Sequence, residues 1–223
     1  MSLNGSHKQY RPKDPDKEVV PGVGGAYEYD QKRASVGLTY QATERLTLNG
    51  QYGHSWLDYD VRSDSDSDTW SASAEYEITS VYTAGAFYTK DYTVSVEDGP
   101  ADSDFFTAYL QYDDRFMLRG SLFIKSSNFV EIDRKDDSYG GELTGELPFN
   151  DKTGMTGLLR YANYDQSGEY EEQYDRYGTK FAVYYETRLG RVSTGYIFNK
   201  NDSDLDSEDY TNNIVYVDAS LKF

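Results

Sequence analysis

Apolar and polar residues alternate in short runs along the chain, from about residue 19 to the C-terminus. The last run shows this most clearly, because its odd positions are apolar: Val215, Val217, Ala219, Leu221 and Phe223. Its even positions hold Tyr216, Asp218, Ser220 and Lys222. Successive side chains of a β-strand point to opposite faces, so the run predicts a strand with one apolar and one largely polar face. Twelve such runs predict twelve strands: Val19–Tyr29, Ala34–Tyr40, Leu46–Tyr59, Thr69–Ile78, Val81–Val94, Phe105–Tyr112, Phe116–Val130, Tyr139–Phe149, Gly154–Tyr164, Tyr177–Thr187, Arg191–Lys200 and Tyr210–Phe223.

The connections between these runs alternate between short and long. The short ones are Gln41–Arg45, Thr79–Ser80, Asp113–Arg115, Asn150–Thr153 and Arg188–Gly190. The long ones are Asp60–Asp68, Ser95–Asp104, Glu131–Ser138, Asp165–Arg176 and Asn201–Asp209. This alternation predicts an antiparallel up-and-down sheet with short turns on one rim and long loops on the other. Ten strands would require merging two of the runs, so twelve is the favoured number.

The apolar faces and the terminal Phe223 resemble those of Gram-negative outer-membrane β-barrels. That resemblance implies an all-β transmembrane barrel with short periplasmic turns and extracellular long loops, a bacterial outer-membrane location, and contact of the terminal strand with the barrel-assembly machinery. Aromatic side chains near the run ends fit girdles at the two membrane surfaces. They are Trp56, Trp70, Tyr82, Tyr112, Phe116, Phe149 and Phe223. The alternative fold is a secreted β-sandwich, in which short and long turns would not separate so regularly.

The composition fits strands better than helices as membrane-crossing elements. Only 37% of the 223 residues are hydrophobic, the mean hydropathy is −0.79, and no run of about 18 apolar residues occurs. A barrel needs an apolar residue only at every second position of a strand. The chain has no cysteine, which excludes disulfides and thiolate sites.

Residues 1–18 are polar and lack periodicity, so we predict a flexible periplasmic leader there and the barrel over residues 19–223. The leader could instead plug the lumen. Residues 1–7 have no secretory signal, so an exported protein would correspond to a mature form.

Acidic residues concentrate in the long loops, which hold 22 acidic and four basic residues in a chain of net charge −17. The rim that they form is therefore strongly acidic, which argues against nucleic acid as a partner. Alternating aspartates there could bind Ca²⁺ or Mg²⁺ weakly. They are Asp64, Asp66, Asp68, Asp202, Asp204 and Asp206. The alternative is a solvated acidic surface that meets outer-membrane lipid and lipopolysaccharide.

The polar faces of the runs predict a charge-balanced lumen. The expected pore-lining residues are Glu75, Glu77, Arg119, Lys125, Glu142, Glu146, Arg160, Lys180, Glu186, Arg191, Asp218 and Lys222. Facing charges could line an open pore, or a network of ion pairs could partly fill it.

No arrangement of catalytic residues is evident, so we predict that the chain is not an enzyme. A Ser–His hydrolase site would need Ser55 and His54 on the same side, but adjacent strand residues face opposite ways. An omptin-like arrangement of His54, Asp58 and Asp60 lacks a supporting motif.

In length and strand number the chain is similar to small twelve-stranded porins, although its lumen is charge-balanced where the acidic-sugar channels of that group are basic. We therefore expect an outer-membrane channel for passive diffusion of small polar solutes, with a preference for cations and no cofactor. The alternatives are a non-transporting barrel that acts in surface binding, adhesion or envelope scaffolding, and a barrel subunit of a larger assembly.

Overall fold

A computed structural model describes residues 2–10, 29–59, 65–95, 99–129, 132–168, 171–205 and 208–221 of the chain. Twelve strands form one sheet in which each pairs antiparallel with its neighbours in sequence, so the predicted up-and-down topology is confirmed. No helix among these residues is long and apolar enough to cross a membrane. The strands are β1 (Ser2–Tyr10), β2 (Tyr29–Gln41), β3 (Leu46–Tyr59), β4 (Ser65–Glu77), β5 (Tyr82–Ser95), β6 (Gly99–Asp113), β7 (Met117–Phe129), β8 (Arg134–Pro148), β9 (Thr153–Ser167), β10 (Glu172–Thr187), β11 (Gly190–Ser203) and β12 (Tyr210–Leu221).

The first strand differs from the sequence prediction. Residues Ser2–Tyr10 form β1, which pairs with β2 from Ser2 opposite Gly37 to Tyr10 opposite Tyr29, instead of a flexible leader. Their polar sequence lacks the apolar alternation on which the prediction depended, but backbone pairing with β2 does not require it. The predicted strand Val19–Tyr29 lies outside the described residues except for Tyr29, which begins β2.

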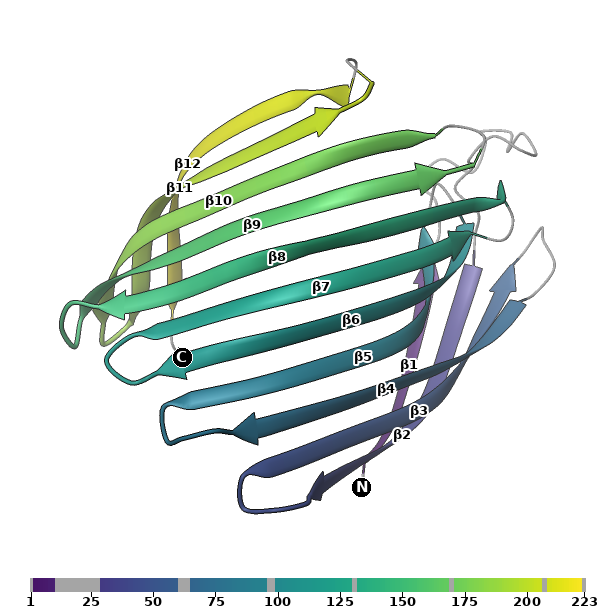
Figure 1. Cartoon of the computed structure of the whole chain (residues 1–223), viewed down its shortest axis with the longest axis horizontal. Helices are drawn as coiled ribbons and strands as arrows, with labels where there is room; N and C mark the ends of the chain where they lie inside the picture. The colour runs from purple at the N-terminus through teal and green to yellow at the C-terminus, as the bar shows by residue number, and fades with distance from the viewer. Residues whose placement is uncertain are drawn as a thin grey trace.

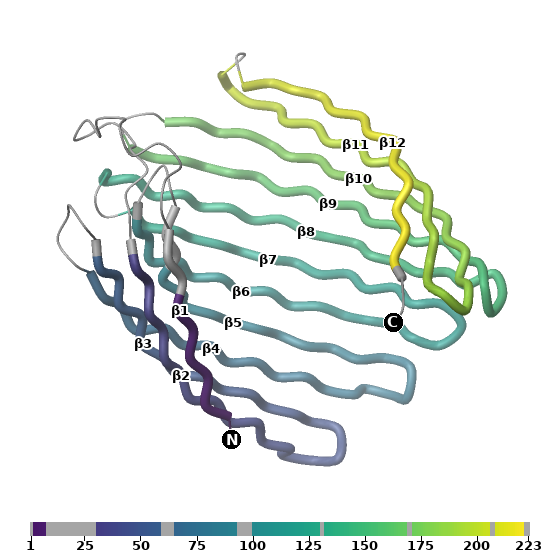
Figure 2. The backbone as a smooth tube through the Cα atoms, turned by 180° about the vertical axis from the view of Figure 1, so that it is seen from behind, coloured from purple at the N-terminus to yellow at the C-terminus, as the bar shows by residue number. Residues whose placement is uncertain are grey.

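The sheet curls strongly, so that its edge strands β1 and β12 lie behind the central strands in Figure 1 and in front of them in Figure 2. Within the described ranges no pairing joins β1 to β12, so the sheet is curled but not closed there. Because the number of strands is even, the two edge strands run antiparallel to each other. A closed barrel of the predicted strands would pair the terminal strand with the first one, near residues 19–29, and residues 19–28 lie outside the described residues.

The two faces of the sheet differ in chemistry. Large apolar side chains are exposed on one face, among them Leu122, Ile124 and Val217. On the other face, polar contacts skip a strand: the Tyr109 hydroxyl of β6 donates to Glu75 of β4 over 2.5 Å. Side chains two strands apart meet most easily on the inside of a curve, so the polar face is concave and the apolar face is convex.

The predicted sides of the terminal strand are confirmed. Asp218 lies opposite Ser193 on the concave face, whereas Val215 lies opposite Tyr196 on the convex face. A slip of one residue would have exchanged the faces. Phe223 and Lys222 lie outside the described residues.

The short turns occur where they were predicted, but the long loops are much shorter than expected. The β3–β4 ladder continues to Leu57 opposite Ser65, and β5 and β6 pair up to Ser95 opposite Gly99. The Ser–Asp sequences of these segments carry no apolar alternation, yet their backbones continue the ladders of the strands beside them. Strands of 12 to 16 residues (β2–β12) therefore extend past the roughly 9–11 residues that cross a membrane. Much of the predicted acidic loop charge lies on these strand extensions.

Side chains within the short turns hold them closed. The Thr79 hydroxyl accepts hydrogen bonds from the backbone N–H groups of Val81 and Tyr82. The side-chain Oδ1 of Asn150 likewise accepts hydrogen bonds from the backbone N–H groups of Lys152 and Thr153. Thr and Asn side chains that accept from the following backbone favour tight turns, so each of these hairpins is stabilised by its own sequence.

Candidate functional site

The candidate site is the concave face, and the strand register places the predicted lining residues there. Eleven of the twelve are described; the twelfth, Lys222, lies outside the described residues. Register partners show the shared face directly: Glu142 lies opposite Arg160, and Glu186 lies opposite Arg191. That these side chains line a water-filled pore stays a prediction.

A tyrosine, a glycine and charged side chains form a compact group on β4–β7. The ring of Tyr109 lies over Gly85 of the neighbouring strand, where an added Cβ would be 2.5 Å from the ring. Its hydroxyl donates to Glu75 one strand further on. The guanidinium of Arg119 stacks on the other side of the ring, with its Cζ 3.7 Å from the ring centroid. Sequence spacing alone did not indicate this group.

The same arrangement recurs four strands later. Tyr184 lies over Gly154, with its Cζ 2.6 Å from an added Cβ, and its hydroxyl reaches Glu146. Arg191 stacks over this ring at 3.5 Å and donates to Glu146 over 3.5 Å. In both groups a guanidinium lies over a tyrosine ring, and in the second it also forms an ion pair with Glu146.

A third tyrosine also packs over a glycine, but the cation near its ring is a lysine ammonium instead of an arginine guanidinium. Tyr216 of β12 covers Gly195 of β11, and an added Cβ there would be 2.7 Å from its hydroxyl oxygen. The ammonium of Lys180 on β10 lies 5.3 Å from the centroid of this ring. Together the three glycines give β5–β12 a wall of flat aromatic rings bordered by charges.

The concave face of β2–β4 has a different character. Between Arg33 near one end and Glu75 and Glu77 near the other, it carries small uncharged polar side chains, which bond to one another across the strands. Thr39 donates to Asn49 over 2.7 Å, and Asn49 donates to Ser73 over 3.1 Å. Nearer to the long-loop end of these strands, Gln51 donates to Ser35 over 2.7 Å. The concave face therefore has an uncharged half and a charged, aromatic half, a division that the sequence analysis did not predict.

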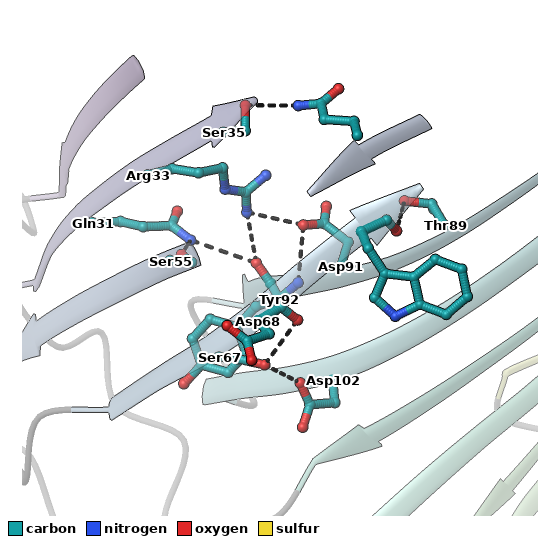
Figure 3. A network of polar contacts seen from close by, with 12 residues as sticks. Gln31, Arg33, Ser35, Ser55, Ser67, Asp68, Thr89, Asp91, Tyr92 and Asp102 are labelled. Atoms are coloured by element: carbon teal, nitrogen blue, oxygen red, sulfur yellow. Dashed lines mark hydrogen bonds and ion pairs between the residues drawn. The ribbon is translucent and has the colours of Figure 1, made fainter. Parts of the chain in front are cut away.

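The far end of the β5–β6 hairpin leaves the wall and folds over the concave face. Pairing of β4 with β5 ends at Trp70 opposite Lys90, although both strands continue beyond this pair. Strands β2 and β5 are three positions apart in the sheet, or roughly 14 Å on a flat sheet. Nevertheless, Arg33 of β2 contacts Asp91 of β5 over 3.0 Å (Figure 3). This contact requires the hairpin to bend inwards.

Several further contacts hold the hairpin in this position (Figure 3). Arg33 donates to the Tyr92 carbonyl over 2.8 Å, as Figure 3 shows. The Tyr92 hydroxyl contacts Ser65 over 2.5 Å. On β6, Asp102 accepts a hydrogen bond of 2.8 Å from Ser67. The hairpin itself carries deeply buried side chains, namely Ala101 (2% exposed), Ser103 (4%) and Tyr92 (5%). Ser55 (0% exposed) contacts Gln31, which also reaches the Tyr92 carbonyl.

The convex face carries His54, and Ser55 faces the opposite way, as the alternation predicted. The imidazole of His54 lies between two carboxylates, with Nδ1 2.8 Å from Asp68 and Nε2 3.2 Å from Asp66. Ser55 instead accepts from Gln31 on the concave side. The two side chains therefore form no Ser–His pair. Hydrogen bonds from His54 and Tyr52 lower the pKa of Asp68.

Four hairpins repeat one outward-facing hydrogen bond. In each, a tyrosine hydroxyl of the first strand donates to an Asp or Asn that precedes its register partner by two residues. The pairs are Tyr52–Asp68, Tyr88–Asp104, Tyr161–Asp175 and Tyr196–Asn213. They mark a common level at which the apolar band meets the acidic strand extensions. The predicted girdle side chains that the structure describes lie on this convex face too, and Phe223 is outside the described residues.

The aspartates predicted as weak metal ligands are dispersed. Asp66 contacts His54, Asp202 accepts from Lys200 over 2.9 Å, and Asp204 accepts from the backbone of Gln173. Asp64 and Asp206 lie outside the described residues. In the described part of the chain, no group of three or more His, Asp or Glu side chains is arranged to hold a metal ion.

The strand order, the apolar convex face and the polar concave face give the chain the architecture of an outer-membrane β-barrel protein. No family model matches the sequence, and no curated protein matches it. The chain is similar to two solved structures. One is OmpT, an outer-membrane protein of Vibrio cholerae, in a trimer form; the identity is 10% and the TM-score 0.47, over 99% of this chain and 92% of that chain. The other is an outer-membrane channel from Pseudomonas putida F1; the identity is 12% and the TM-score 0.43, over 87% of this chain and 85% of that chain. Both TM-scores are below 0.5, so the fold assignment rests on the strand pairing of this chain.

Proposed function

We propose that the chain is an outer-membrane channel for passive diffusion of small polar solutes, with a preference for cations and no enzymatic activity. The observation that carries this proposal is that acidic and basic side chains lie side by side along the concave face, where Glu142 is opposite Arg160 and Glu186 is opposite Arg191. Arg191 contacts Glu146 and Glu186 over 3.5 and 3.9 Å, all on the same side of the sheet. Apart from the inward contacts of the β5–β6 hairpin, extensive contacts among the described residues join only neighbouring strands, which supports an interior that solvent and solute can enter.

The width of the sheet and its polar lining support this function. A barrel of eight strands is just filled by its own side chains, and twelve strands enclose a wider interior. Glycines beneath Tyr109 and Tyr184 let these rings lie flat along the wall, so they take little room from the lumen. Hydroxyl and amide groups of the uncharged half, such as Asn49 and Ser73, can exchange hydrogen bonds with water or a polar solute.

The acidic strand extensions support the preference for cations. They stand at one mouth of the proposed pore, and the five segments to which they belong hold 22 acidic and four basic residues. A mouth of one charge sign concentrates ions of the opposite sign. We expect lowered salt to strengthen this preference, because screening falls with ionic strength.

Conductance of the purified protein in planar lipid bilayers tests the proposal. We expect discrete openings, and a reversal potential in a salt gradient that indicates cation selectivity. Folded protein without conductance would contradict channel function. The β5–β6 hairpin, which covers part of the concave face, is the observation that favours the second candidate, a closed barrel that acts in surface binding or as an envelope scaffold.

A further inference from the structure

Two apolar hollows lie end to end on the convex face over β7–β10. The larger has a volume of about 1040 Å³ and is bordered by Leu122, Ile124 and Tyr161. The smaller, of about 460 Å³, is bordered by Phe116, Leu147 and Phe181. Leu143, Leu159 and Thr179 line both, so the hollows form one groove along the strands. We name it the outer groove.

Glycines form the floor of the outer groove. An added Cβ at Gly157 would meet no atom within 4 Å, and one at Gly120 would meet only a Leu143 methyl at 3.9 Å. These positions are therefore open, unlike Gly85 and Gly154, whose space is filled by tyrosine rings. The structure leaves unfilled volume here instead of packing it with its own side chains.

Each hollow is about as long as one leaflet of a membrane is thick. The larger covers Gly120–Ile124 on β7, and the smaller covers Leu143–Leu147 on β8. Five residues of a strand extend about 13 Å, which is about half of the roughly 25 Å apolar band of outer-membrane barrels. The larger hollow ends at Tyr139, Tyr161 and Tyr177, where phenol groups suit the polar boundary of a membrane.

We propose that the outer groove binds acyl chains of membrane lipids, the larger hollow taking those of an outer-leaflet lipid. The groove is continuous with the convex apolar face, which contacts lipid in the proposed location, and flexible chains can fill an irregular hollow. A second copy fits less well, because a two-fold interface would set the hollow against itself and leave a void. The inference rests on the membrane location proposed above but not on channel activity.

Replacement of the floor glycines tests this proposal. Gly120→Leu and Gly157→Leu fill the larger and smaller hollows, respectively. Gly50→Leu is the matched control, because Gly50 also faces outwards with no atom within 4 Å of an added Cβ but lines neither hollow. Native mass spectrometry after titration with dipalmitoyl phosphatidylethanolamine measures bound lipid. Displacing about two methylene groups from burial should weaken binding about tenfold in the two groove variants.

The control should bind lipid like the unmodified protein. Equal lipid binding by all the variants, or an equal loss in all three, would overturn the proposal. So would a dimer, detected by light scattering, that only the groove variants convert to monomers, because the groove would then join two copies. If a leucine variant does not fold, Gly120→Ala and Gly157→Ala should show a smaller loss of the same sign. Conductance recorded in parallel separates failure of channel function from failure of lipid binding.

Discussion

Single glycines decide where aromatic rings can lie on the concave face. Gly85, Gly154 and Gly195 each lie beneath a tyrosine of the following strand, and the ring occupies the space that a side chain would need. Glycine ordinarily weakens a strand. Here it allows ring packing over the strand and places the hydroxyl groups of Tyr109 and Tyr184 near glutamates two strands away.

Substitution of Gly154 tests this role. In Gly154→Val, the new Cβ would lie 2.6 Å from Tyr184 Cζ and 2.8 Å from the Leu147 carbonyl oxygen, so the ring or backbone must shift. We expect a loss of about 1–3 kcal/mol in the free energy of unfolding, measured by urea titration in lipid vesicles. Gly50→Val is the control, because its site is open and valine favours strands. Equal stability of the two variants would contradict this account.

Asp68 provides a test of pH dependence. Hydrogen bonds from His54 and Tyr52 lower its pKa in the folded protein, so the carboxylate stabilises the fold above its unfolded pKa. This contribution is lost as pH falls through the folded pKa. Asp68→Asn should therefore lower the urea midpoint at neutral pH, and the difference should begin to shrink as pH falls below about 4 and vanish only below the folded pKa. A difference that stays constant across this range would show that the carboxylate charge is not the cause.

At the scale of elements, the β5–β6 hairpin is the part that leaves the regular wall. It is held by an ion pair with β2 and by hydrogen bonds to β4, and its side chains Ala101, Ser103 and Tyr92 are buried. Since it covers part of the concave face, its position should influence what passes through the proposed channel.

Removal of the Arg33 side chain should release this hairpin. Arg33 contacts Asp91 over 3.0 Å and the Tyr92 carbonyl over 2.8 Å, so we expect Arg33→Ala to show larger or fluctuating single-channel conductance. Lys32→Ala is the matched control, because Lys32 forms an ion pair of the same length with Asp58 on the opposite face. Similar conductance changes in the two variants would argue against a specific effect of the hairpin.

Thiol labelling tests the hairpin position independently of conductance. Ala101 is 2% exposed, and the chain contains no cysteine. Ala101→Cys should therefore resist a polar maleimide in the otherwise unmodified protein and react after Arg33→Ala. Rapid labelling in both backgrounds would contradict the inward position.

At the scale of the whole molecule, the two edges of the curled sheet must be paired in a membrane. An unpaired strand edge exposes backbone N–H and C=O groups, which cost several kcal/mol each in hydrocarbon. The edge strands β1 and β12 run antiparallel to each other, so they can pair directly and close a barrel.

Cysteine pairs across this seam test closure. Ser6 of β1 and Tyr216 and Asp218 of β12 lie on the concave face, so Ser6→Cys combined with Tyr216→Cys or Asp218→Cys should give a disulfide in one combination in folded protein. The pair Ser193→Cys and Asp218→Cys, which are register partners on β11 and β12, is the positive control. Disulfide formation in the control alone would indicate that these positions do not meet across the seam.

The sequence predicted those features that depend on alternation. The faces of β12, the opposite orientations of His54 and Ser55, and the sites of the short turns all follow from a period of two residues and from turn-forming residues. It did not predict β1 or the length of the acidic strand extensions, because polar segments such as Ser65–Asp68 carry no apolar alternation and take their register from a neighbouring strand. The inward bend of β5–β6 depends on contacts between residues 59 positions apart, such as Arg33 and Tyr92.

The order of the strands also has a consequence for the rate of folding. Every pairing in the described sheet joins strands that follow each other in sequence, so each hairpin can form from local contacts. Closure between β1 and β12 would instead join segments about 200 residues apart, at the greatest loop-closure entropy in the molecule. The seam should therefore close last, and refolding into lipid vesicles should end in a slow phase that a covalent link between the two edges accelerates.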